Sequence, residues 1–293
     1  MTATLIDGKA IAAELASENA LRAARLRDAG TVPGLAVVIV GEDPASRIYV
    51  RHKALACEKA GLASWVHALP ADTPQERLIG FLHALNADAA VHGILVQLPL
   101  PGALDARAVI GAIDPAKDVD GFHYRNVGAL FVGEPALCAC TPWGVMKMLE
   151  HEGIGVEGKH AVVVGRSTIV GKPMALLLLN AGATVTVCHS KTTDLPSLTR
   201  QADILVAAVG RARMITGDMV KPGAVVIDVG INRLQDGKLC GDVDQESVAK
   251  VAARLSPVPG GVGPMTIAVL VANTLRAAEK AAGIAAPRET RFA

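Results

Sequence analysis

The sequence has few aromatic residues, almost no net charge and no long apolar run. Aromatic side chains make up 3% of the 293 residues, so any core must be largely aliphatic. The formal net charge of +1 provides no basic excess for binding a nucleic-acid backbone. No apolar run reaches the ~18 residues of a membrane span, and Asp7, Lys9 and Glu14 stand where a secretory signal would be apolar. We therefore expect neither a nucleic-acid nor a membrane partner.

Cysteine is also scarce, with five residues at irregular spacing. The single close pair, Cys138 and Cys140, has no second pair and no histidine partner at the spacing of a zinc site. An odd number of cysteines does not form a closed disulfide framework. We expect reduced thiols, a cytoplasmic location and no metal site.

Aliphatic residues and glycine dominate, which is typical of buried parallel strands covered by helices on both faces. Short apolar runs alternate with helical patterns, so the fold class is α/β, and the length suits two domains. Strands are expected at 35–40, 64–69, 93–98, 161–164, 184–188, 204–209 and 224–229. Helices are expected at 8–29, 43–60, 74–85, 105–113, 141–151, 171–181, 194–202, 244–255 and 265–282.

The stretch from Lys159 to Gly171 is the most informative part of the chain. A β-branched run ends at Gly165, a polar turn follows, and Gly171 opens a helical segment. Such a turn presents backbone N–H groups and a helix dipole to a phosphate. The spacing departs from G-x-G-x-x-G, and many α/β folds have a glycine after a strand. The second strand that follows, at 184–188, is what favours a dinucleotide site.

The end of that second strand indicates which dinucleotide is bound. An NAD site usually places an acidic residue there, whereas this chain has His189, Ser190 and Lys191. A carboxylate would repel a 2′-phosphate, while a hydroxyl and cations attract it. Arg166 adds a planar guanidinium suited to phosphate. The alternative is a solvated basic turn, and charge favours NADP as the cofactor.

The first half carries a second set of polar residues. Ser46, Tyr49 and Lys53 share one face of the expected helix, within about 60°. Alone, they describe an exposed helix face. Gln97 stands at the end of an apolar strand, where its amide needs a partner. The charged turn at 114–121 lacks the alternating ligands of a calcium loop.

Taken together, these segments resemble the bifunctional methylenetetrahydrofolate dehydrogenase/cyclohydrolase family. Ala139 departs from the proline that the family often has there, and Arg51 and His52 form a locally variable pair. Eight motifs occur in the family's order: Gly41 to Lys53, Val96 to Pro101, Lys117 to Phe122, Cys140 to Pro142, Gly165 to Gly171, Cys188 to Ser190, Asp228 to Asn232 and Pro259 to Thr266.

The resemblance implies an enzyme of one-carbon metabolism with two activities. NADP-dependent oxidation converts 5,10-methylenetetrahydrofolate to the methenyl cation, and hydrolysis then yields 10-formyltetrahydrofolate. Tetrahydrofolate derivatives are the implied ligands, and a homodimer is the implied assembly. The family assigns residues 1–138 plus 270–293 to a folate-binding catalytic domain and 139–269 to a Rossmann-like doubly wound domain, with a cleft between them.

The resemblance also implies residue roles. Lys53 is the central catalytic residue, Gln97 holds it, Tyr49 stacks on the substrate, and Asp120 accepts hydrogen bonds from the pterin amino edge. Arg166 and Ser190 take the 2′-phosphate. The implied cofactor-binding residues are Gly165, Arg166, Ser167, Ser190 and Ile231, and the folate side is lined by Pro259, Gly260 and Gly261.

Three alternatives remain. Tyr49 and Lys53 imitate the Y-x-x-x-K pair of short-chain reductases, but they precede the glycine-rich turn instead of following it. A dehydrogenase without hydrolase activity is the second alternative, which retention of Lys53 and Gln97 disfavours. The third is a non-catalytic NADP-sensing or scaffold protein. It would not require a polar site at these positions.

Overall fold

The chain forms two compact α/β units. The computed structural model describes residues 2–102 and 104–285. Within the described residues, the six-stranded unit consists of those up to Ala13 and of Thr141–Thr266, and the three-stranded unit consists of those in Glu14–Cys140 and from Ile267 on. This division confirms the expected α/β class with two domains.

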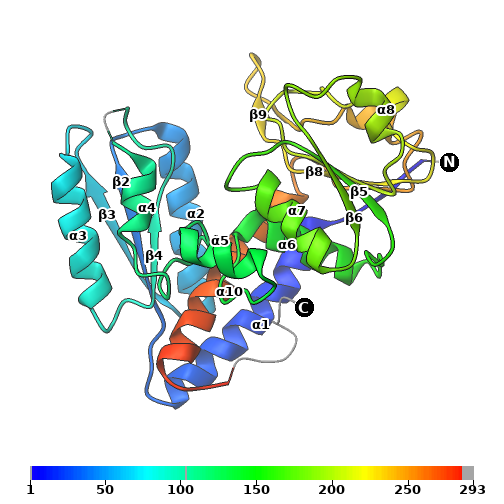
Figure 1. Cartoon of the computed structure of the whole chain (residues 1–293). Coiled ribbons are helices and arrows are strands. Elements are labelled where there is room, and N and C mark those ends of the chain that lie inside the picture. Colours follow the sequence, from blue (N-terminus) through cyan, green and yellow to red (C-terminus); the bar gives the residue numbers. More distant parts are fainter. Residues whose placement is uncertain (1, 103, 286–293) are drawn as a thin grey trace. The chain divides into compact units, whose positions relative to one another are not determined.

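The three-stranded unit is built on a parallel sheet. β2 (Gly34–Val40) lies between β3 (Ala63–Leu69) and β4 (Gly93–Val96). Every residue of β2 is buried, which explains its uninterrupted apolar sequence. One face packs against α3 (Gln75–Ala87) and α4 (Ala106–Gly111). Figure 1 shows α2 and α3 on opposite sides of this sheet.

Helix α2 (Pro44–Ala60) begins and ends where its sequence predicts. The Asp43 carboxylate accepts a hydrogen bond from the Ser46 N–H at 2.7 Å, and Pro44 occupies the first turn. Gly61 ends the helix in the left-handed conformation, with φ of 81°. The expected start at Asp43 and stop at Gly61 are therefore confirmed.

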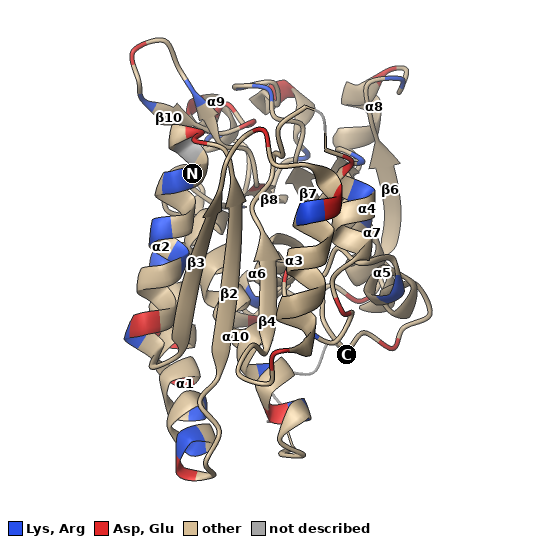
Figure 2. Ribbon diagram, turned by 90° about the vertical axis from the view of Figure 1, so that its left-hand side faces the viewer, with Lys and Arg blue, Asp and Glu red and all other residues tan. Residues whose placement is uncertain are grey.

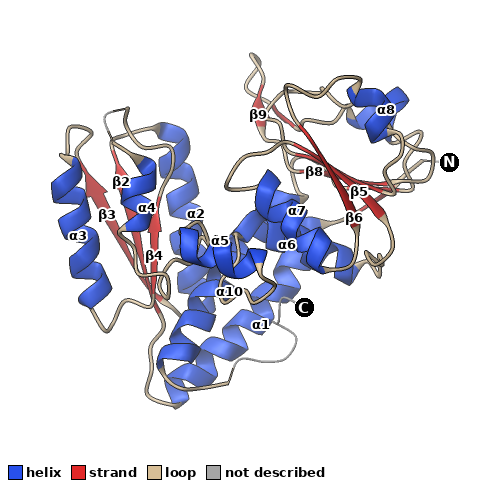
Figure 3. Cartoon of the chain, in the orientation of Figure 1, coloured by secondary structure: helices blue, strands red, loops and turns tan. Residues whose placement is uncertain are grey.

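Two long helices, α1 (Gly8–Asp28) and α10 (Val262–Ala281), complete this unit. The part of α1 from Glu14 and the part of α10 from Ile267 belong to it. Figure 3 shows them side by side, and the buried Arg22 guanidinium contacts the Glu279 carboxylate at 2.8 Å. Acidic and basic residues are intermixed along α1 (Figure 2). Among the described residues, no helix has both the length and the apolar character needed to cross a membrane.

The six-stranded unit holds a fully parallel sheet in the order β1-β11-β8-β7-β5-β6. β6 lies on one side of β5 and β7 on the other, so the winding reverses beside β5, as in a doubly wound fold. Figure 1 shows α7 and α8 on opposite sides of this sheet. The strands are β1 (Thr4–Leu5), β5 (His160–Val164), β6 (Thr184–Cys188), β7 (Ile204–Ala207), β8 (Val225–Asp228) and β11 (Arg254–Leu255). The helices are α6 (Cys140–His151), α7 (Gly171–Asn180), α8 (Leu195–Thr199) and α9 (Gln245–Val248).

The structure corrects the expected helix at 244–255. Only Gln245–Val248 is helical, and Arg254–Leu255 forms strand β11 between β1 and β8. Two-residue strands are too short to produce a period-2 pattern, so the sequence did not predict β1 or β11. Helix α5 (Tyr124–Phe131) and the β9-β10 hairpin (Asn232–Arg233 with Leu239–Cys240) were also not expected.

The bounds of the two units differ from the expected domains at the N-terminus. The chain up to Ala13 groups with Thr141–Thr266 instead of with the first half. The cause is β1, which pairs in parallel with β11. Residues 286–293 of the expected folate domain lie outside the described residues. The functional labels of the two domains remain a prediction.

Candidate active site

Lys53 and Gln97 meet in the three-stranded unit although 44 positions separate them. The buried Lys53 Nζ on α2 donates a hydrogen bond to Gln97 Oε1 at 3.1 Å. Gln97 follows β4, and its Nε2 donates to the Leu98 carbonyl at 2.7 Å. That second bond orients the amide with its oxygen toward the ammonium. The predicted need of Gln97 for a partner is met, and the pair leaves Lys53 with further donor capacity.

Asp120 lies within electrostatic range of Lys53. Burial raises the pKa of Asp120 to about 6, while the Lys53 charge lowers it. The Cys140 thiol donates to the Val119 carbonyl at 3.3 Å and lies 3.9 Å from Asp120 Oδ1. Burial, and then the Asp120 charge, raise the pKa of Cys140 well above that of a free thiol. Cys140 is therefore a neutral neighbour of this carboxyl.

Sequence reasoning assigned Cys140 no role. Its motif was noticed, but its contact with Asp120 spans 20 positions and could not be inferred from spacing.

Tyr49 stands one turn before Lys53 on α2 and keeps 38% of its surface exposed. Partial burial raises the pKa of its phenol, so Tyr49 is a neutral ring accessible from solvent.

The loop that carries Asp120 is held from both sides. On one side, buried Asp118 accepts hydrogen bonds from Asn126 Nδ2 and His123 N, each at 2.8 Å. On the other, the Asn273 side chain on α10 donates to the Val119 carbonyl at 2.9 Å. Bonds at Asp118 and Val119, the two residues before Asp120, restrict the backbone that leads into it, so the carboxylate has a defined position before a ligand arrives.

In the six-stranded unit, the glycine turn after β5 is tightly built. Gly165 has φ of 127°, and a Cβ there would collide with the Ala208 carbonyl oxygen. A Cβ on Gly171 would collide with the Gly165 carbonyl oxygen. Ser167 Oγ accepts hydrogen bonds from the N–H groups of Val170 and Gly171, at 3.1 and 3.2 Å. Ser167 thus fixes the start of α7.

Arg166 and Ser190 follow strand ends that pair with each other. Val164 of β5 is in register with Cys188 of β6, and each exposed side chain comes two residues later. The Gly165 N–H donates to the Cys188 carbonyl at 2.8 Å, which joins the two turns. A guanidinium and a hydroxyl therefore emerge from adjacent strand ends, an arrangement that suits one phosphate group.

Ile231 lies at the same edge of the sheet, after β8, and 46% of its surface is exposed. The expected folate-side loop lies close to it, because a Cβ on Gly263 would lie 3.8 Å from Ile231 Cδ1. Within this loop Gly260 has φ of 105°, and a Cβ on Gly261 would meet the Pro257 carbonyl oxygen at 2.5 Å. Gly260 and Gly261 therefore leave two consecutive backbone positions after Pro259 bare of side chains.

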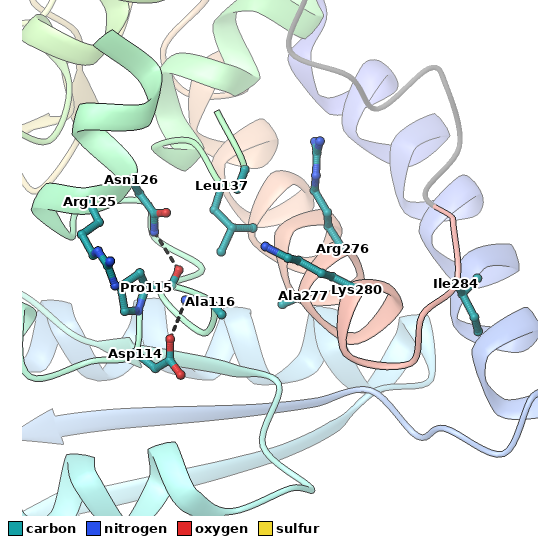
Figure 4. Close-up of a pocket in the computed structure, with 11 residues that line it drawn as sticks. Asp114, Pro115, Ala116, Arg125, Asn126, Leu137, Arg276, Ala277, Lys280 and Ile284 are labelled. Carbon is teal, nitrogen blue, oxygen red and sulfur yellow. Dashed lines mark hydrogen bonds between the residues drawn. The ribbon is translucent and has the colours of Figure 1, made fainter. Parts of the chain in front are cut away.

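A separate pocket of about 490 Å³ opens elsewhere in the three-stranded unit. Figure 4 shows Arg125 from α5 and Lys280 from α10 at this pocket, with Asp114 below them. Neither Lys53 nor Asp120 lines it. This pocket is therefore not the candidate active site.

Two family models match the chain. The model described as "Tetrahydrofolate dehydrogenase/cyclohydrolase, catalytic domain" matches residues 6–120. The one described as "Tetrahydrofolate dehydrogenase/cyclohydrolase, NAD(P)-binding domain" matches residues 139–282. The second model covers the turns that carry Gly165, Arg166, Ser190 and Ile231.

Similar proteins and solved structures agree with the two family models. Bifunctional protein FolD of Bordetella avium is 63% identical over 280 residues, which is 96% of this chain and 99% of that protein. The crystal structure of the bifunctional enzyme from Campylobacter jejuni has a TM-score of 0.93 at 50% identity, covering 94% of this chain and 99% of that one.

A Trypanosoma brucei methylenetetrahydrofolate dehydrogenase-cyclohydrolase, solved with NADP cofactor and an inhibitor, has a TM-score of 0.92 at 40% identity. The match covers 96% of this chain and 98% of that one. The two family models and the relatives, which match over nearly their full length, indicate the same family. The chain therefore belongs to the tetrahydrofolate dehydrogenase/cyclohydrolase family.

Proposed function

We propose that Lys53 is the acid–base residue of this bifunctional enzyme. The chain oxidises 5,10-methylenetetrahydrofolate with NADP and hydrolyses the methenyl product to 10-formyltetrahydrofolate. The observation that supports the role of Lys53 is the 3.1 Å bond from its buried Nζ to Gln97, beside the Asp120 carboxyl. Family membership removes the short-chain reductase and scaffold alternatives.

Substrate binding is assigned to the face of α2 and the loop after β4. Asp120, as a carboxylate, accepts two hydrogen bonds from the pterin amino edge. The exposed Tyr49 ring stacks on the flat ring system. Gln97 holds the Lys53 amine and orients the one-carbon bridge. The family resemblance assigns the backbone of Pro259, Gly260 and Gly261 to the folate side.

Cofactor binding is assigned to the carboxyl-end turns of the six-stranded sheet. The tight turn at Gly165 suits a pyrophosphate, and Ser167 fixes that turn while its hydroxyl proton remains available as a donor. Arg166 and Ser190 bind the 2′-phosphate, and Ile231 packs against the nicotinamide side. When bound, NADP accepts the hydride from the bridging carbon. The protein contributes placement, because the two flanking nitrogens stabilise the cation.

Hydrolysis depends on proton handling by Lys53. The Lys53 Nζ, held by Gln97, is the group that we assign to exchange a proton with the attacking water. That amine accepts a proton from water as the water oxygen bonds to the methenyl carbon. The bond from this carbon to N5 then breaks, N5 takes a proton, and the formyl group remains on N10. One water enters and one proton leaves per turnover.

An absorbance assay with methylenetetrahydrofolate and NADP tests the two steps together. We expect NADPH to form without lasting accumulation of the methenyl compound. Accumulation of that compound would show that hydrolysis is absent, which is the alternative of a dehydrogenase alone. No NADPH formation would contradict the proposed function.

We further propose a cytoplasmic homodimer. All five cysteines are free thiols, four of them buried, which suits a reducing compartment. The dimer is carried over from the family resemblance. Light scattering after gel filtration measures the assembly: twice the chain mass is expected, and the mass of a single chain would contradict it.

A further inference from the structure

Two fully buried carboxyl groups in the six-stranded unit have no role in the function described so far. Asp228 is 1% exposed and Asp242 is 0% exposed. In the described part of the chain, the donors bonded to them are backbone N–H groups and side-chain amides. Buried carboxylates carry a large desolvation cost, so an arrangement that maintains two of them requires an explanation.

Asp242 binds a turn of three consecutive backbone N–H groups. Its Oδ2 accepts from Val209 N at 2.6 Å and from Gly210 N at 2.9 Å, and its Oδ1 accepts from Arg211 N at 2.9 Å. Such a concave run of N–H groups is an anion-binding nest. Gly210 and Arg211 are themselves exposed. A buried anion thus anchors a turn that faces solvent at the carboxyl end of β7.

The same carboxylate reaches the segment after β8. Asp242 Oδ1 also accepts from Asn232 Nδ2 at 2.9 Å. A Cβ on Gly230 would collide with this carboxylate, so only glycine permits the approach. Ile231 stands between these two residues, and its side chain is exposed. Asp242 therefore sets where Ile231 projects from the sheet edge.

Asp228 extends the network to a third strand. It accepts hydrogen bonds from the N–H groups of Asp242 at 2.9 Å and Val243 at 3.0 Å, and its own N–H donates to Ser256 Oγ at 2.8 Å. Ser256 directly follows β11 and stands three residues before Pro259. Asp242 and Asp228, through their carboxylates and the Asp228 N–H, thereby join the ends of β7, β8 and β11. These are the ends where doubly wound sheets bind ligands.

We propose that Asp242 is a positioning residue for the dehydrogenase reaction, fixing the β7 turn and Ile231 against the nicotinamide end of the cofactor. The inference rests on the proposed cofactor site. Asp242 acts through Val209, Gly210, Arg211 and Asn232 rather than by touching substrate. A network that serves only folding would support both activities equally. Measuring both reactions in one variant therefore distinguishes a positioning role of Asp242 from a role in folding stability alone.

The test is Asp242→Asn, assayed for both activities. The amide keeps the shape of the carboxylate but turns an N–H₂ group toward backbone donors, leaving at least one of them unsatisfied. We expect kcat/KM for NADP in the dehydrogenase reaction to fall about 10–100-fold, with KM for NADP raised. Hydrolysis of supplied methenyltetrahydrofolate stays near the wild-type rate, because Lys53, Gln97 and Asp120 belong to the other unit.

Asp203→Asn is the matched control. Asp203 precedes β7 at the amino end of the same sheet, where it is paired with Lys221 at 2.7 Å. The Asp203→Asn substitution makes the same chemical change at the opposite end of the sheet from the proposed cofactor site. We expect this variant to retain both activities. If Asp242→Asn does not fold, Asn232→Ala removes a single bond to the same carboxylate, and it should show a smaller loss in the same direction.

An unchanged dehydrogenase reaction in folded Asp242→Asn, or parallel loss of both activities, would overturn the inference. Failure of the proposed function gives a different result. In that case the wild-type enzyme itself would show no saturable NADP-dependent oxidation. A wild-type enzyme that saturates with NADP, together with a selective loss in the variant, supports the positioning role.

Discussion

Replacing Lys53 with methionine tests the proposed acid–base residue with little change in shape. Methionine is unbranched and suits a helix, so α2 should form normally. The substitution removes the 3.1 Å bond to Gln97 and the positive charge that lowers the pKa of Asp120. A positioned general acid–base residue contributes about 10²–10⁴-fold in rate, which corresponds to roughly 3–5 kcal/mol of transition-state stabilisation.

We therefore expect the hydrolysis rate of Lys53→Met to fall by about 10²–10⁴-fold. The assay follows the decay of methenyltetrahydrofolate absorbance, and titration calorimetry measures NADP binding separately. NADP affinity should be retained, because the assigned cofactor contacts lie in the six-stranded unit. Lys59→Met is the control, since Lys59 is exposed near the end of the same helix. A hydrolysis rate like that of the control would remove Lys53 from the mechanism.

The remaining predictions concern the cofactor, pH and stability. Arg166→Ala should weaken NADP by about 10–100-fold through loss of a charge-assisted contact and weaken NAD less; equal losses would show that Arg166 does not recognise the 2′-phosphate. Because burial raises the pKa of Asp120 to about 6, this carboxyl gains a proton as pH falls through that value and loses acceptor capacity. kcat/KM for methylenetetrahydrofolate should therefore fall below that pH, and a pH profile without this limb would contradict the role of Asp120. Arg22→Met leaves the buried Glu279 carboxylate unpaired and should destabilise the protein by about 3–5 kcal/mol; an unchanged melting temperature would contradict this.

Much of the fold follows from local patterns. The uninterrupted apolar run of β2 identified a buried strand, and Asp43, Pro44 and Gly61 marked the ends of α2. Strand β11 could not be inferred because its two residues pair with β1 and β8, far away in sequence. Their pairing is decided by tertiary contacts, and no local periodicity reports it.

The candidate site was accessible to sequence reasoning only through the family resemblance. Spacing placed Tyr49 and Lys53 on one helix face, but it could not show that Lys53 reaches Gln97. Asp242 was missed altogether. A Gly-Asp pair in a loop is typical turn composition, and its four acceptor contacts become visible only once β7 and β8 lie side by side.

The most direct test of the proposed roles of Lys53 and Asp120 is a crystal structure of the enzyme with NADP and a stable analogue of the 5,10-bridged folate. We expect the pterin amino edge on Asp120 and Lys53 Nζ about 3–3.5 Å from the bridging carbon or a water beside it, the separation of reacting groups. A bound folate that leaves the Lys53 amine pointing into solvent, with Asp120 making no contact to the pterin, would contradict both roles.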